Sequence, residues 1–240
     1  MLDVGRFDAI TFDCYGTLID WEQGILNALQ PVLAPRGVDA SPDELLERYA
    51  RHEAALEAGP YLSYRDVLVR SLRGLCEELG VSPTADEAVA FASAIADWPA
   101  FPDTAAALRK LHGRFRLGVI TNCDRDLFAL SNRRLGITFD WVVTAEDARG
   151  YKPGPRPFEL AFETIDVPRE RILHAAQSLF HDHVPAGRLG LASVWVDRRH
   201  GRPGFGATPP ASASPDLVVP DMRTLAALAA GKARPNRPPE

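Results

Sequence analysis

Side chains able to act as nucleophile, base or hydrogen-bond donor follow separate apolar segments of this 240-residue chain: Asp13, Thr121 with Asn122, Lys152, and Asp182. A carboxylate such as Asp13 is a weak nucleophile that needs help. Lys152 can offset the repulsion between that carboxylate and an anionic substrate. Thr121 and Asn122 can donate hydrogen bonds, the amides of the turn after Asp13 can stabilise an oxyanion, and Asp182 can activate water. Together these residue types are the ones that catalysis by a carboxylate nucleophile requires.

The elements that would position these residues alternate along most of the chain. A strand is expected at 7–12, directly before Asp13. Further strands are expected at 115–120, 141–144, 172–176, 192–196 and 218–219, between helices at 103–112, 125–135, 155–165, 183–189 and 221–230. This alternation predicts an α/β fold with a parallel sheet, in which ligands bind beyond the carboxyl ends of the strands. One strand-end Asp is as well explained by a cap or a turn, but several at successive strand ends favour a site.

A nearly all-helical block at 17–98 interrupts this alternation. Helices are expected at 22–35, 41–56, 62–79 and 84–96, and the second begins with a Ser41 cap followed by Pro42. A chain of this length is long for one compact domain, so a core with a smaller inserted domain is a natural division. Segment 203–215 is expected to be a loop, and the tail 232–240, with its three prolines and three basic residues, is expected to be disordered.

Composition and charge exclude several classes of protein. The formal net charge of −5 argues against a nucleic-acid or anionic-membrane partner. No apolar run approaches the ~18 residues of a membrane helix, and charges within 1–12 argue against a signal peptide. The three cysteines (Cys14, Cys76 and Cys123) are far apart, which suits a reducing compartment and no metal site. We therefore expect a cytoplasmic protein, with Cys14 packing rather than reacting.

The polar sites also resemble the motifs of a known superfamily. Residues 13–18 (Asp-Cys-Tyr-Gly-Thr-Leu) resemble the first motif of the haloacid dehalogenase-like hydrolases, and Thr121-Asn122, Lys152-Pro153 and Asp182 resemble the other three motifs in order. The resemblance covers nearly the whole chain. It implies a Rossmann-like core at 1–16 and 99–231, with residues 17–98 as a helical cap. It also implies substrate contacts from Tyr15, Thr17, Ser178 and His181.

Departures at the motifs indicate a branch of this superfamily. Its phosphatases have Asp-x-Asp at the first motif and bind Mg²⁺, whereas Tyr15 and Gln177 stand at two of the expected acidic positions. The pattern Asp-x-Tyr-Gly-Thr is that of the L-2-haloacid dehalogenases, which implies no metal and no cofactor. That branch would have a Tyr where Phe158 stands and an Asn where Leu179 stands, and Arg51 is the candidate for its halide-binding Arg. These departures put halide release in doubt.

Further runs at 11–22, 98–104, 178–183, 198–201 and 206–208 resemble enzymes of the same branch that open the ring of L-azetidine-2-carboxylate. The resemblance implies SN2 attack by Asp13 at C2 of a small 2-substituted carboxylic acid, with the azetidine as first substrate and an (S)-2-haloacid as the alternative. A Mg²⁺-dependent phosphatase and a non-catalytic binding relative remain lesser alternatives. Asp20, Trp21 and Asp124 are candidates to bind the ammonium leaving group, because carboxylates and Trp faces attract cations. Dehalogenases of this branch are often dimers, which implies a homodimer.

Two groups of basic residues have structural interpretations beside functional ones. His181 and His183 flank Asp182, and we expect one to cap the following helix and the other to pack under it, although His181 remains a candidate substrate contact. Arg198-Arg199-His200 is interpreted as a solvated turn rather than an anion site.

Overall fold

A six-stranded parallel sheet forms the centre of the molecule. The computed structural model describes residues 2–230, so the tail expected to be disordered at 232–240 lies outside the described residues. The strand order is β3-β2-β1-β4-β5-β6, which reverses direction at β1 and is that of a Rossmann-like fold. The strands are β1 (Ala9–Phe12), β2 (Arg116–Thr121), β3 (Trp141–Thr144), β4 (Ile172–Ala176), β5 (Ala192–Val196) and β6 (Leu217–Val219).

Helices cover both faces of this sheet because successive strand residues point to opposite faces. Ile10 and Phe12 join the larger apolar core, together with residues of α5 (Thr104–His112), α6 (Arg125–Leu135) and α10 (Met222–Ala230). Ala9 joins a second core with residues of α8 (Arg156–Thr164) and α9 (Val184–Leu189). The short helix α7 (Ala145–Ala148) was not predicted, and the helix expected at 183–189 is preceded by a π-helical turn at Leu179–His183.

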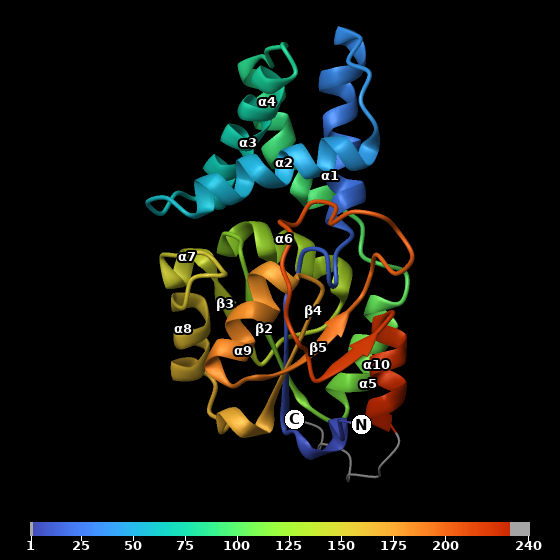
Figure 1. The fold of residues 1–240 in the computed structure, drawn as a ribbon. Coiled ribbons are helices and arrows are strands. Elements are labelled where there is room, and N and C mark those ends of the chain that lie inside the picture. The colour runs from blue at the N-terminus through green and yellow to red at the C-terminus, as the bar shows by residue number, and fades with distance from the viewer. Residues whose placement is uncertain (1, 231–240) are drawn as a thin grey trace.

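The helical block packs above the sheet as a cap (Figure 1). Its helices are α1 (Trp21–Leu33), α2 (Pro42–Glu57), α3 (Tyr64–Glu78) and α4 (Ala85–Ser93). Side chains of Ser41, Ser63 and Thr84 each accept a bond from a backbone N–H in the first turn of α2, α3 and α4, which satisfies amides that the helix leaves free. No helix among residues 2–230 is long and apolar enough to cross a membrane.

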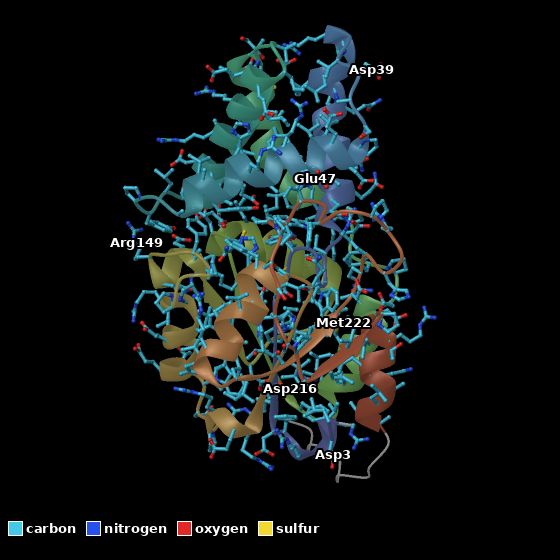
Figure 2. The ribbon with its side chains drawn as sticks, in the orientation of Figure 1. Asp3, Asp39, Glu47, Arg149, Asp216 and Met222 are labelled. Atoms are coloured by element: carbon cyan, nitrogen blue, oxygen red, sulfur yellow. The ribbon has the colours of Figure 1, made fainter. Side chains whose placement is uncertain are left out.

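Contacts from the core hold the cap in place. Arg199 lies in the loop after β5, and its guanidinium bonds Glu22 of α1 at 2.6 Å and Asp43 of α2 at 2.9 Å. Arg149, at the end of α7 (Figure 2), places its guanidinium 4.3 Å from the ring centre of Tyr61. The solvated turn expected at 198–200 is therefore wrong for Arg199, which is 8% exposed: the cap lies over that turn and supplies its partners.

Candidate active site

A buried lysine joins two carboxylates at the carboxyl ends of β1 and β4. The Lys152 ammonium donates to Asp13 Oδ1 at 2.9 Å, to Asp182 Oδ1 at 2.7 Å and to the carbonyl of Ile120 at 2.9 Å. Asp13 and Asp182 are 6% and 0% exposed and Lys152 is 1% exposed. Three residues far apart in sequence meet here because parallel strands end at the same edge of a sheet.

The charges of Asp13, Lys152 and Asp182, here called the triplet, determine the protonation state of each group. Burial alone would lower the pKa of Lys152, but the carboxylates of Asp13 and Asp182 raise it above its usual range. Burial alone would also raise the pKa of Asp182, but Lys152 and the His174 ring hold it well below its usual range. Burial raises the pKa of Asp13, and Lys152 is the largest opposing influence. Asp182 is thus a carboxylate and Lys152 an ammonium near neutral pH, which supports an anionic Asp13.

Thr17 and Asn122 connect the triplet to the surrounding loops through hydrogen bonds. Thr17 donates its hydroxyl to Asp13 Oδ2 at 2.7 Å, and the Thr17 hydroxyl oxygen accepts the Gln177 amide at 2.9 Å. The Asn122 side chain bonds both the N–H of Lys152 at 2.7 Å and its carbonyl at 2.9 Å. Thr17 therefore leaves Asp13 Oδ1 as the oxygen that faces Lys152, and Asn122 fixes the backbone from which Lys152 extends.

A small cavity with a volume of about 20 Å³ lies between this triplet and the cap. Its walls come from both domains and comprise Asp13, Tyr15, Trp21, Glu53, Glu57, Tyr64, Asn122, Lys152, Ser178, His181 and Asp182. The ring of Tyr15 stacks on Tyr64 at 6.4 Å, and its hydroxyl bonds Ser131 at 3.0 Å. The aromatic rings around this small space limit the access of water.

Two cavity residues, Glu53 and Glu57 of α2, are absent from the candidates that the sequence supplied. Glu53 accepts the hydroxyls of Tyr49 at 2.9 Å and Tyr64 at 3.0 Å. Glu57 accepts the Asn122 side-chain N–H at 3.2 Å. Both glutamates continue the buried face of α2 that Leu46, Tyr49 and Ala50 begin, so an acid at helical spacing on an apolar face was the signal that could have identified them.

Several sequence candidates lie outside the cavity. Arg51 points away from it: its guanidinium bonds Glu78 at 2.9 Å and its side chain is 61% exposed. Asp20 caps α1 by accepting the Gln23 amide at 3.2 Å. Asp124 accepts the amides of Tyr64 at 2.8 Å and Arg65 at 3.0 Å, and so anchors α3 to the core. The expectation that these three contact substrate is not supported by their positions, since local backbone or ion-pair partners occupy them.

Of the remaining candidates, some line the cavity and others have structural positions outside it. Ser178 accepts the amide of His181 at 2.9 Å, and both line the cavity. Burial lowers the pKa of His181 to about 4, so its ring is neutral. His183 is structural, with ring nitrogens bonded to Ser193 at 3.0 Å and the Ala176 carbonyl at 2.9 Å. Thr121 does not line the cavity, and its buried hydroxyl has no hydrogen-bond partner within the described chain.

The donor set at the base of the cavity does not fit a magnesium ion. Mg²⁺ takes hard anionic oxygens in an octahedral arrangement, but Asp13 and Asp182 both bond the Lys152 ammonium. Residues 2–230 contain no cluster of three His, Cys, Asp or Glu side chains arranged to hold a metal. Tyr15 also occupies the position at which a second acidic group would follow Asp13.

Comparison with known proteins identifies relatives of this arrangement. The chain is 27% identical over 201 residues to the (S)-2-haloacid dehalogenase of Pseudomonas putida, covering 82% of this chain and 87% of that protein. It is 30% identical over 214 residues to the 5-amino-6-(5-phospho-D-ribitylamino)uracil phosphatase YigB of Escherichia coli, covering 82% of this chain and 87% of that one. The fold matches the L-2-haloacid dehalogenase structure from Xanthobacter autotrophicus with a TM-score of 0.78 at 22% identity, covering 95% of this chain and 100% of that one. Residues 7–175 match the haloacid dehalogenase-like hydrolase family, and the chain belongs to that family of enzymes.

Proposed function

We propose that this hydrolase attacks C2 of a small 2-substituted carboxylic acid with Asp13, and that L-azetidine-2-carboxylate is its substrate. The observation that carries the proposal is the Asp13–Lys152 pair, 2.9 Å apart at the base of a small enclosed cavity. Lys152 keeps Asp13 anionic in a site of low dielectric, and Thr17 orients the carboxylate. Asp13 is therefore prepared to act as a nucleophile towards a substrate held above it.

The reaction balances in two steps. In the first, an Asp13 oxygen bonds to C2 while the C2–N ring bond breaks, and the electron pair of that bond passes to nitrogen. In the second, water attacks the ester carbonyl of Asp13, releases the 2-hydroxy acid and restores the carboxylate. Asp182 Oδ2 is buried and has no hydrogen-bond partner among the described residues, so it is available to accept a bond from that water. The proton released by ester cleavage ends on the amine.

The basic groups of the cavity support an amine rather than a halide as the leaving group. Lys152 is the one Lys or Arg among the described residues that line the cavity, and its bonds to two carboxylates and a carbonyl occupy its three N–H groups. Arg51, the sequence candidate for halide binding, is exposed on the cap. The runs of sequence that resemble azetidine-opening enzymes point the same way.

The second candidate is hydrolysis of an (S)-2-haloacid. It is supported by the 27% identity to the P. putida enzyme over most of both chains. The two candidates share the nucleophile and the C2 position, and they differ only in the group that leaves. Hydrolysis of a phosphate ester, the activity named for the E. coli relative, is disfavoured because the carboxylates that would hold Mg²⁺ are paired with Lys152.

The test is mass spectrometry of products after incubation with L-azetidine-2-carboxylate or (S)-2-chloropropionate, without added metal. We expect a 2-hydroxy acid from the wild-type protein and none from Asp13→Asn. Asp39→Asn, at an exposed position of the cap (Figure 2), is the matched control and should retain wild-type activity. Full activity of Asp13→Asn would contradict the proposal, as would a protein that binds either acid without ever forming an Asp13 ester.

A further inference from the structure

Two buried glutamates form the wall of the cavity that faces Asp13 from the cap. Glu53 is 3% exposed and the side chain of Glu57 is 4% exposed. They lie one turn apart on α2, so their carboxyl groups project from the same side of the helix. Glu53 uses one oxygen to accept two tyrosine hydroxyls, and Glu57 uses one to accept the Asn122 N–H. Within residues 2–230, the second oxygen of each glutamate has no hydrogen bond.

Carboxyl groups outnumber cationic groups around these glutamates. Four carboxyl groups line the cavity and one ammonium group faces them, and that ammonium is bound to Asp13 and Asp182. Burial raises the pKa of Glu53 to about 7. Burial also raises the pKa of Glu57, and the charge of Glu53 adds to this effect. A cation bound between the glutamates would lower both pKa values, because each carboxylate would gain an opposite charge.

A second observation indicates that this wall is built for a ligand. His181 is 8% exposed and its Nε2 has no hydrogen-bond partner within the described residues, although it lies 3.6 Å from Glu57 Oε2. Buried polar nitrogens are rarely left without a partner. The rings of Trp21 and Tyr64 also line the cavity, and aromatic faces attract cations. Carboxylates and aromatic faces suit a cationic ligand. His181 Nε2 can accept an N–H from such a ligand when Nδ1 of the ring carries the proton and donates to Ser178 Oγ, 3.1 Å away.

We infer that Glu53 and Glu57 form an ammonium subsite that receives the nitrogen on C2 of the substrate, and that they select small cyclic amino acids over 2-haloacids. The inference rests on the proposed reaction at Asp13. The ring NH₂⁺ donates one hydrogen bond to the free oxygen of each glutamate while C2 lies over Asp13. When the C2–N bond breaks, the nitrogen leaves as a neutral amine and takes up the proton that ester hydrolysis releases. A halide would instead develop negative charge where the one ammonium group of the cavity is already bound to Asp13 and Asp182, which is unfavourable.

The subsite is tested by comparing two substrates on the same variants. For Glu57→Gln and Glu53→Gln, we expect kcat/KM for L-azetidine-2-carboxylate to fall about 10- to 100-fold, the range for loss of a hydrogen bond to a charged group. The value for (S)-2-chloropropionate should stay the same or rise. Glu47→Gln is the matched control, because Glu47 lies on α2 but is exposed (Figure 2), and it should change neither value. Equal losses on both substrates, or no loss on the amine, would overturn the subsite.

A binding measurement separates this inference from the proposed chemistry. Calorimetry with Asp13→Asn, which cannot form the ester, reports the affinity of each acid without turnover. We expect L-azetidine-2-carboxylate to bind at least tenfold more tightly than (S)-2-chloropropionate, and Asp13→Asn combined with Glu57→Gln to lose that preference. Equal binding of the two acids would overturn the subsite even if Asp13 chemistry holds. A retained preference in a protein that turns over neither acid would reject the chemistry and leave the subsite standing.

Discussion

Replacing Lys152 with methionine tests the electrostatic centre of the molecule. Lys152 is 1% exposed and makes the bonds to Asp13 and Asp182 at 2.9 and 2.7 Å. Its removal leaves two buried carboxylates with no cation between them. Breaking a buried pair by removing one partner costs about 3–5 kcal/mol, and because 1.36 kcal/mol is a factor of ten, the unfolding equilibrium constant should rise at least ~100-fold at pH 7.

The loss of stability in Lys152→Met should depend on pH, and the direction of this dependence can be derived. Burial already raises the pKa of Asp13, and without Lys152 the charge of Asp182 raises it further. A pKa that is higher in the folded state contributes stability that is present below the unfolded value of about 4 and is lost as the pH rises through the folded value. The difference in unfolding free energy between Lys152→Met and wild type should therefore shrink as the pH falls from 7 towards 4.

The assay is urea unfolding followed by tryptophan fluorescence at pH 7 and pH 5. Arg156→Met is the control, because it removes an ion pair to Glu159 in which the two side chains are 53% and 44% exposed, and such pairs contribute about 0–1 kcal/mol. An unchanged midpoint and slope for Lys152→Met at pH 7, or a deficit that grows on acidification, would refute the electrostatic reasoning.

Three further substitutions test other parts of the account. Thr17→Val removes the 2.7 Å bond to Asp13 and should lower kcat by about tenfold or more with an unchanged circular dichroism spectrum; wild-type kcat would show that Thr17 does not orient the nucleophile. Gly24→Ala would place a Cβ 2.3 Å from the Trp98 ring, and should destabilise the protein by about 1–3 kcal/mol in urea unfolding, whereas an unchanged midpoint would mean that the cap relaxes freely. Ser41→Ala removes the α2 cap and should lower the free energy of unfolding by about 1 kcal/mol in urea unfolding. An unchanged free energy would show that water replaces the cap without loss of stability.

The core elements and the position of the nucleophile follow from local patterns. The strands expected at 141–144, 172–176 and 192–196 have those bounds in the structure, because apolar runs bounded by turn residues are strong local signals. The convergence of Asp13, Lys152 and Asp182 follows from topology, since parallel strands bring their carboxyl ends to one edge.

The residues of α2 that line the cavity could not be predicted in the same way, because their identity depends on how α2 packs on the core. Arg51 was expected to face substrate and instead lies on the outer side of α2, whereas Glu53 and Glu57 face inward. Asp124 was expected to bind an ammonium group and instead anchors α3 through backbone amides. For α2, the rotation of the helix about its axis, which long-range contacts set, decides which polar side chain reaches the cavity. For Asp124, the position of the first turn of α3 decides it, because that turn supplies the two amides. The expected homodimer stays a prediction.

A single-turnover reaction in H₂¹⁸O tests the central claim that Asp13 forms a covalent ester. With enzyme in excess over L-azetidine-2-carboxylate, or over (S)-2-chloropropionate if the amine is not turned over, we expect the product hydroxyl to carry ¹⁶O from Asp13. The ¹⁸O should appear in the Asp13 side chain, located by fragmentation of the tryptic peptide 7–36. Product hydroxyl labelled with ¹⁸O in the first turnover, with an unlabelled Asp13, would show that water attacks C2 directly and would contradict the account.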